Sequence, residues 1–229
     1  MKSNFIKGFT ATIPVGLSVC AYGLVLGVLA YSKGVTFFEL LFMDIVTFAG
    51  SAQLLMVELW KDPLPFTEIL FAVFAINLRY LLIGASLTPL FKGSSLFEKA
   101  ALMHLVADEN WAVTMSRLKK EKITPYFLFG GGICLVIFWL FSTLAGHTFG
   151  FIISDPYSVG LDFVIIIIFT ALVASFYDGK DSIFPWIVAA LFAYLSFVFI
   201  PGKWYIVIGG IAGAFSYSLL KHFRGEESE

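Results

Sequence analysis

Long apolar runs without a charged residue are the feature that most constrains this chain. Gly8–Ser32 and Ile123–Ser154 contain no Asp, Glu, Lys or Arg. A helix needs about 20 apolar residues to cross the hydrocarbon core of a bilayer, and only helices and closed barrels satisfy their backbone there. The runs lack the alternation of a barrel strand. The sequence therefore predicts an all-α, polytopic membrane protein.

The composition supports this class and excludes others. Hydrophobic residues make up 59% of the chain and charged residues 14%, whereas soluble domains carry about 25% charged residues. This balance argues against a cytosolic globular protein, a disordered chain and a coiled coil. The net charge of −1 gives no reason to expect a nucleic-acid partner. Cys20 and Cys134 lie within apolar runs and are expected to be buried apolar residues.

About eight segments qualify as transmembrane helices, with short loops between them and some helices short or broken. They are Gly8–Ser32, Glu39–Leu59, Phe66–Phe91, Leu96–Leu118, Ile123–Ser154, Gly160–Tyr177, Ser182–Pro201 and Trp204–Leu220. We expect a single transporter-like domain over residues 1–229. No internal repeat is obvious, but inverted repeats are often only weakly visible in sequence, so one remains possible.

Loop charges predict the orientation. If all eight segments cross, ten Lys and Arg residues lie on the side of the N-terminus and four on the other. The positive-inside rule then places both termini in the cytoplasm. Leu96–Leu118 is the weakest segment, because it contains charged residues near its middle. We expect it to cross, since otherwise the basic cluster Arg117–Lys122 would face outward.

Charged residues at membrane depth mark the candidate site. A charge at a helix centre costs about 2.5–3.5 kcal/mol on insertion scales. Arg79, Asp108 and Glu109 are the deepest, whereas Asp44 and Asp162 lie closer to segment ends. One interpretation is a buried ion pair that only pins helices together. The other, which we favour, is a polar cavity, because buried pairs are poor stabilisers.

His104 lies four residues before Asp108, which predicts that the two share one helix face. A metal site built on this pair would lack further ligands nearby in sequence. We therefore expect no metal and no cofactor.

A second signal is the interruption of the second segment by small and polar residues, Phe48–Gln53. Close helix packing would explain it. Unwound helices in transporters also expose backbone N–H groups and positive helix ends to substrate. Both interpretations stay open for Gly50, Ser51 and Gln53. No motif places a nucleophile beside a base, and the phosphate-binding loop and the zinc-protease motif are absent, so we do not expect an enzyme.

In these residues the chain resembles the AzlC family, the large subunits of bacterial branched-chain amino acid exporters. The resemblance is carried by Pro14, Gly16, Phe48-Ala49-Gly50-Ser51-Ala52-Gln53, Asn77-Leu78-Arg79-Tyr80, Ser86-Leu87, Pro89, Asp108-Glu109 and Gly160-Leu161-Asp162-Phe163. The chain departs from the family at Tyr80, where members often carry histidine. The resemblance implies a secondary transporter in the bacterial cytoplasmic membrane that exports valine, leucine, isoleucine and sometimes methionine. It also implies a small membrane partner of the AzlD type.

An amino acid zwitterion needs donors for its carboxylate, acceptors for its ammonium group and an apolar pocket. Our hypothesis assigns the carboxylate to the broken helix and Arg79, and the ammonium group or a coupled proton to Asp108 or Glu109. Burial and a neighbouring arginine can tune a carboxyl group to exchange protons near neutral pH. The predicted substrate-binding residues are Gly50, Ser51, Gln53, Asn77, Arg79, Asp108, Glu109 and Trp111. The candidates for proton coupling are Asp108, Glu109 and His104.

Two other functions fit the same residues. A passive channel for a small polar solute also needs a polar path, but no alternating access. In a membrane scaffold without transport activity, the charges would only fix helix packing.

Overall fold

The regular elements of the chain are all helices, as predicted. The computed structural model describes residues 2–153, 160, 163, 167, 170, 174, 177, 179–200 and 204–223 and contains no strand among them. The α-helices are α1 (Lys2–Ser32), α2 (Phe37–Thr47), α3 (Gly50–Glu58), α4 (Phe66–Asn77), α5 (Arg79–Leu87), α6 (Leu96–His104), α7 (Asp108–Leu118), α8 (Pro125–Phe149), α10 (Ile183–Phe199) and α11 (Trp204–Phe223). Short 3-10 turns follow α8 and precede α10.

Four helical stretches among the described residues are long and apolar enough to cross a membrane: Lys2–Ser32, Phe66–Leu87, Pro125–Ile152 and Lys180–Phe199. The predicted number of about eight crossings is therefore not confirmed. Most of the predicted segment Gly160–Tyr177, with Asp162, lies outside the described residues.

The contacts divide the chain into two units, the first formed by residues 1–61 and 77–162 and the second by 62–76 and 163–229. In the second unit α10 and α11 pack against each other. Gly213 and Gly209 of α11 lie so close to Ala189 and Ala193 of α10 that a Cβ atom would crowd them. Phe71 of α4 stacks near Trp204 of α11, with ring centroids 5.3 Å apart. The expectation of one domain over residues 1–229 stays a prediction.

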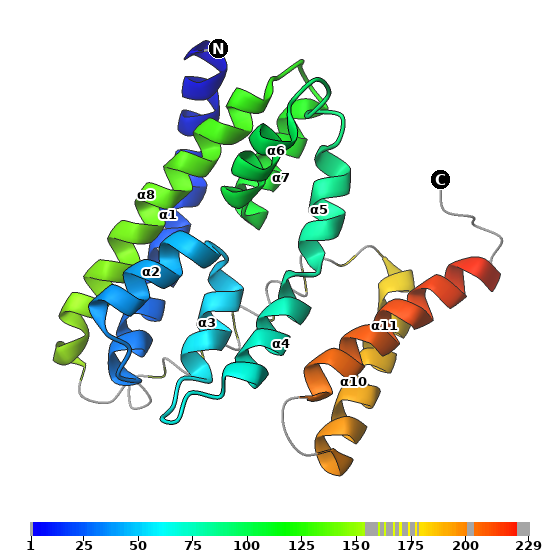
Figure 1. Ribbon diagram of the computed structural model, residues 1–229. Helices are drawn as coiled ribbons and strands as arrows, with labels where there is room; N and C mark the ends of the chain where they lie inside the picture. The colour runs from blue at the N-terminus through cyan, green and yellow to red at the C-terminus, as the bar shows by residue number, and fades with distance from the viewer. Residues whose placement is uncertain are drawn as a thin grey trace. The chain divides into compact units, whose positions relative to one another are not determined.

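The first unit is built on a tightly packed parallel pair, α1 and α8 (Figure 1). A Cβ atom at Gly8 would overlap the carbonyl group of Phe127, and one at Gly27 would overlap that of Thr143. Both helices advance in the same direction through these contacts, which makes the pair parallel. Small residues permit such an approach of two backbones inside a membrane.

The predicted second segment is a pair of short helices, α2 and α3, that returns to the end at which it starts. The chain turns at Phe48, whose φ of 20° is unusual for a residue with a bulky side chain. Lys33 follows α1 and lies 3.7 Å from Glu58, the last residue of α3. Both ends of this hairpin, residues 37–58, are therefore near the C-terminal end of α1. We call it the first hairpin.

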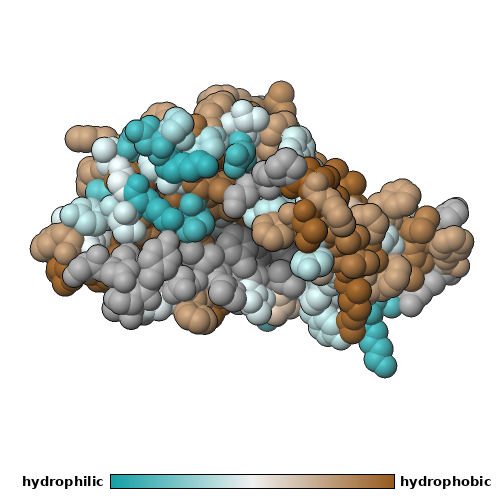
Figure 2. All heavy atoms as spheres, turned by 90° about the horizontal axis from the view of Figure 1, so that it is seen from below, coloured by the Kyte–Doolittle hydropathy of each residue, from teal (hydrophilic) through white to brown (hydrophobic). Residues whose placement is uncertain are grey.

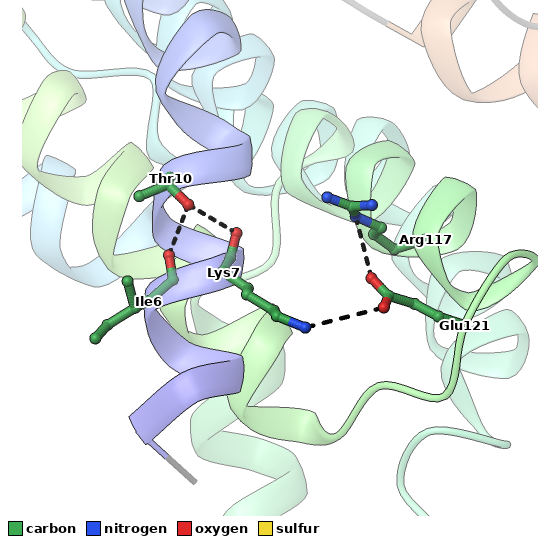
Figure 3. A network of polar contacts seen from close by, with 5 residues as sticks. All are labelled: Ile6, Lys7, Thr10, Arg117 and Glu121. Atoms are coloured by element: carbon green, nitrogen blue, oxygen red, sulfur yellow. Dashed lines mark hydrogen bonds and ion pairs between the residues drawn. The ribbon is translucent and has the colours of Figure 1, made fainter.

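The predicted fourth segment is also a helix pair, α6 and α7, which we call the second hairpin (residues 96–118). Beyond its end, Glu121 forms ion pairs with Arg117, whose Nε atom lies 3.5 Å from Oε1, and with Lys7 of α1, whose Nζ atom lies 4.0 Å from Oε2 (Figure 3). At its start and end, Phe91 and Leu118 belong to one apolar cluster around Leu128. Both ends of this hairpin are therefore near the N-terminal end of α1.

The two hairpins thus start from opposite ends of the α1–α8 pair, and their tips meet (Figure 1). His104, at the end of α6, places its Nε2 atom 2.8 Å from the carbonyl oxygen of Ile45 in α2. The four helices of the hairpins have 11, 9, 9 and 11 residues. None is long enough to cross a bilayer alone. The expected crossings at Glu39–Leu59 and Leu96–Leu118 are not confirmed.

The surface agrees with a lipid environment. Large apolar side chains such as Phe38, Leu82 and Phe141 are largely exposed. In Figure 2 hydrophobic residues dominate much of the coloured surface, and the hydrophilic ones gather mainly in one region. Exposed apolar surface of this extent is unfavourable in water and favourable against lipid. The chain is a helical membrane protein.

Candidate functional site

Arg79 is at the centre of a polar cluster where three interrupted segments come together. It is the first residue of α5, and its Nη1 atom lies 2.6 Å from Oδ2 of Asp108, the first residue of α7. Its Nη2 atom donates to Oγ of Ser51, the second residue of α3, at 2.6 Å. The side chains of Arg79 and Asp108 are 14% and 28% exposed. The structure thus joins three of the predicted site residues at the meeting point of the two hairpins.

Two helix N-termini adjoin this cluster, which adds positive potential to that of the guanidinium group. Ala49 precedes α3 and Ala107 precedes α7, and neither has a side chain that can accept from the first turn. Uncapped N–H groups at a helix start carry a partial positive charge. Asp108 is favourably placed at such a start. The two helix starts thus add to the positive potential that Arg79 provides beside Asp108.

Several buried polar atoms around Arg79 have no hydrogen-bond partner among the described residues. They are Nε of Arg79, Oδ1 of Asn77 and the hydroxyl group of Tyr22 on α1. Glu109 and Tyr22 are close enough to Arg79 and Asp108 to interact with them electrostatically. Buried polar groups in native proteins are normally paired. Nε of Arg79 and the Tyr22 hydroxyl group, which belong to the same electrostatic cluster, are thus candidate partners for a polar ligand.

An apolar wall lies beside the ion pair. Trp111 follows Asp108 by three residues on α7, and its Nε1 atom donates to Oγ of Ser86 on α5 at 2.8 Å. Ser86 in turn lies two helical turns after Arg79, so α5 and α7 are joined by two polar contacts on facing sides. The ring of Tyr80 lies 5.4 Å from the guanidinium carbon of Arg79. Trp111 and Tyr80 both pack against the cluster around Leu128.

Gln53 does not join the Arg79 cluster but forms a second one with Asp44. Oδ1 of Asp44 accepts from Gln53 Nε2 at 2.7 Å and from Trp139 Nε1 at 3.0 Å. Its Oδ2 accepts from the hydroxyl group of Thr143 at 2.6 Å. Sequence reasoning underrated this carboxyl group because it seemed closer to a segment end. An Asp inside the apolar stretch Phe42–Val46 was the signal that could have found it.

Gly50 connects the two clusters through packing. A Cβ atom at this position would lie 2.9 Å from the ring of Trp139 and 3.1 Å from that of Tyr22. The rings themselves are in edge contact, with centroids 5.2 Å apart. Gly50 therefore allows the rings of Trp139 and Tyr22 to lie close to the backbone at the start of α3. Tyr22, Trp139 and Thr143, on α1 and α8, were missed by sequence reasoning because aromatic and hydroxyl residues in an apolar helix carry no distinctive pattern.

The expectation for His104 is wrong in one respect. α6 ends at His104 and α7 begins at Asp108, so the two residues do not share a helix face. The reason is the turn at Leu105–Ala107, which Asn110 stabilises: its Nδ2 donates to the Leu105 carbonyl group at 2.9 Å, and its Oδ1 accepts from Ala107 N–H at 2.8 Å. Among the described residues no three His, Cys, Asp or Glu side chains are grouped as metal ligands would be.

Comparison with known proteins agrees with the resemblance in the sequence. The sequence model of the family described as AzlC protein matches residues 14–153. An uncharacterized membrane protein of Helicobacter pylori (strain ATCC 700392 / 26695) is 25% identical over 169 residues, which cover 73% of each chain. The branched-chain amino acid transport protein AzlC of Bacillus subtilis (strain 168) is 22% identical over 73% of this chain and 66% of its own. No solved structure matches the chain.

The family match includes both hairpins, the Arg79 cluster and the Asp44 cluster, and it covers more than half of the chain. This protein therefore belongs to the AzlC family.

Proposed function

We propose that this protein is a secondary transporter that exports branched-chain amino acids across the bacterial cytoplasmic membrane. Valine, leucine and isoleucine are the proposed substrates, with methionine as a further candidate. It would act as the large subunit of a two-component system together with a small membrane subunit of the AzlD type. The name of the Bacillus subtilis relative supports the substrate class.

The observation that carries the proposal is the Arg79–Asp108 pair among unpaired polar atoms. Without substrate, each charge neutralises the other. An amino acid brings one negative and one positive group, so it can replace each partner without changing the net charge of the site. Its carboxylate would bind Arg79 and the start of α3 with Ser51, and its ammonium group would bind Asp108 or Glu109. Asn77 Oδ1 and the Tyr22 hydroxyl group supply further contacts.

The branched side chain would lie against the apolar wall of Trp111 and Tyr80. An aliphatic side chain of this size gains about 1.5–3 kcal/mol when it leaves water. The site thus combines a charged end with an apolar end, as an aliphatic zwitterion requires.

The charge distribution in the first unit supports a cytoplasmic N-terminus. Its basic residues outside the membrane-depth cluster gather near the N-terminal ends of α1 and α8: Lys2, Lys7, Lys92, Lys99, Arg117, Lys119, Lys120 and Lys122. Lys33 and Lys61 are at the other end. Because each hairpin begins and ends at the same end of α1, more of these Lys and Arg residues lie at the N-terminal end of α1 than the sequence prediction placed there. This excess favours a cytoplasmic N-terminus. A cytoplasmic C-terminus stays a prediction, since residues 224–229 lie outside the described residues.

A transport assay tests this function. The full chain is reconstituted in proteoliposomes, with and without the candidate small subunit, and the uptake of labelled amino acids is measured under imposed pH gradients. We expect saturable accumulation of leucine, isoleucine and valine, and little of lysine or glutamate, whose side chains would place a charge against the apolar wall. Flux that never exceeds equilibration would instead identify a channel. Absence of flux in both preparations would favour a scaffold.

A further inference from the structure

We propose that Asp44 is the proton-binding site of this protein and that the first hairpin couples its protonation to the substrate site. This inference rests on the proposed transport function and names the coupled ion. It moves the proton from the residues expected from sequence, Asp108, Glu109 and His104, to a carboxyl group on the other hairpin.

The Asp44 carboxyl group is enclosed by neutral donors alone. It is 2% exposed, and Gln53, Trp139 and Thr143 donate to its two oxygens. Among the described residues no Lys, Arg or His nitrogen forms an ion pair with it. A buried carboxylate without a countercharge is costly. Asp108, in contrast, is paired with Arg79.

The groups around Asp44 can form hydrogen bonds with its carboxyl group in both the ionised and the protonated form. In the ionised form Thr143 donates its hydroxyl hydrogen to Oδ2. When a proton from the aqueous phase binds Oδ2, a new O–H bond forms and the charge of the carboxyl group changes from −1 to zero. The hydroxyl group of Thr143 can then accept from Oδ2 and turn its own hydrogen to the carbonyl oxygen of Trp139, which lies 3.0 Å away. No side chain has to leave its position.

The chemistry of the cluster selects a proton over a metal ion. A cation such as Na⁺ needs several oxygen atoms with free lone pairs around it. Two of the three groups that contact Asp44 are N–H donors, and the indole N–H of Trp139 can only donate. A metal ion at the carboxylate would face these hydrogens.

α3 links the proton site to the substrate site. Gln53 binds Asp44, and two residues earlier in the same helix Ser51 binds Arg79. Gln53 is fully buried, its Oε1 has no partner among the described residues, and its bond to Asp44 ties the first turn of α3 to α2. Hydrogen bonds to an ionised group are about twice as strong as neutral ones. Protonation of Asp44 therefore weakens the hydrogen bond from Gln53 that holds α3. The position of Ser51 relative to Arg79 and to a bound amino acid then changes.

The other titratable groups on the helices around the cluster contact groups other than the Asp44 carboxylate. Tyr22 of α1 is in edge contact with the ring of Trp139, whose Nε1 atom donates to Asp44. His147 of α8 contacts the carbonyl oxygen of Val35 at 2.7 Å, and His104 of α6 contacts that of Ile45 at 2.8 Å. Glu58 of α3 pairs with Lys33, and Glu39 of α2 caps its own helix at Thr36. His147 is the natural control for a pH effect.

The test separates driven transport from exchange, using labelled leucine and the full chain in proteoliposomes. Wild type should accumulate leucine when a pH gradient is imposed and should also exchange internal for external leucine without a gradient. Asp44→Asn keeps the shape of the side chain but cannot take up a proton. We expect gradient-driven accumulation to fall at least about tenfold, while exchange continues within about threefold of wild type and no longer depends on pH. His147→Gln should keep both activities.

Accumulation at the wild-type level in Asp44→Asn, or loss of the pH dependence in His147→Gln alone, would overturn the proposal. If Asp44→Asn loses exchange as well, infrared difference spectra test whether Asp44 binds a proton. Wild type should show a carbonyl band of a protonated carboxylic acid that titrates with pH, and Thr143→Val, which removes its hydrogen-bond partner, should move that band. No such band, or one unaffected by Thr143→Val, would contradict a proton on Asp44. The spectra need no transported substrate, so they remain informative if leucine is not transported and the proposed function fails.

Discussion

The two hairpins are closed in similar ways but with acceptors of different chemistry. In each, an amide side chain from the first turn of the second helix reaches back across the tip. In the first hairpin Gln53 donates to the carboxylate of Asp44 at 2.7 Å. In the second hairpin Asn110 donates to the backbone carbonyl group of Leu105 at 2.9 Å.

This difference separates two tasks that a coupled transporter must perform. A backbone carbonyl group does not gain or lose a proton between acidic and basic pH. The hydrogen bond that closes the second hairpin therefore does not depend on pH. Its carboxylate, Asp108, is instead paired with Arg79 and faces the proposed substrate. The carboxylate of the first hairpin closes the turn itself. One hairpin thus offers charge to a zwitterion, and the other can respond to a proton.

The largest expected effect is the loss of the charge that joins the hairpins. Arg79→Ala leaves Asp108 without its partner, and removal of one member of a buried pair costs about 3–5 kcal/mol. We expect kcat/KM for leucine to fall at least about 100-fold, because the substrate carboxylate loses its countercharge, and truncating one partner of a buried charge pair in a binding site costs about 2–5 kcal/mol. Uptake into proteoliposomes measures it at equal protein level.

The matched control for this variant is Arg117→Ala, because Arg117 lies at the end of the second hairpin and pairs with Glu121 at the surface. Its transport should stay near the wild-type level. If Arg79→Ala transported as well as Arg117→Ala, the Arg79 cluster would not be the binding site.

Joint neutralisation distinguishes binding from helix packing. Arg79→Gln combined with Asp108→Asn removes both charges and keeps polar groups in place. We expect the double variant to be more stable to heat than either single variant, since no unpaired charge remains, yet to stay inactive. A double variant that transports leucine normally would show that the pair only holds helices together.

These residues also show how far the sequence alone could reach. The apolar runs predicted the helical membrane class, because bilayer thickness sets the length of a crossing helix. They could not show that Glu39–Leu59 and Leu96–Leu118 return to their own sides. Apolar length is the same for a crossing helix and for a pair of short helices, and the turn is decided by distant contacts such as those of Lys33 and Lys7.

The part of the candidate site that the sequence could predict consists of polar and charged residues whose burial at membrane depth costs free energy. Arg79, Asp108 and Ser51 were expected together, and the structure brings them into direct contact. Their role in substrate binding stays a prediction. Asp44 could have been singled out as a carboxyl group in an apolar stretch, but its partners Trp139 and Thr143 could not be predicted, because they are 95 and 99 residues away in the chain.

A moderate effect on stability is expected from the first hairpin. Thr143→Val leaves Oδ2 of Asp44 without a donor among the described residues, and a buried acceptor without its partner costs about 1–3 kcal/mol. Thermal unfolding in detergent should show a lower midpoint. Thr10→Val is the control, since Thr10 is exposed and bonds only to carbonyl groups of its own helix (Figure 3). Equal midpoints for the two variants would argue against a buried anchor at Thr143.

The smallest effect concerns the apolar wall of the second hairpin. Trp111→Phe keeps an aromatic ring but removes the hydrogen bond to Ser86, which is worth about 0.5–1.5 kcal/mol. We expect KM for leucine to rise about two- to tenfold with kcat unchanged, whereas Trp204→Phe on α11 should change neither. An unchanged KM in both variants would remove Trp111 from the substrate site.

The most direct test of the central claim uses ligands that carry only half of the zwitterion. Isocaproate keeps the carboxylate and apolar chain of leucine without the ammonium group, and isoamylamine keeps the ammonium group without the carboxylate. Competition with labelled leucine binding is measured on the purified full chain in lipid nanodiscs. Because the Arg79–Asp108 pair exchanges both charges at once, leucine, valine and isoleucine should compete and neither half-ligand should. Competition by isocaproate or isoamylamine at leucine-like concentrations would contradict recognition of a zwitterion by this pair.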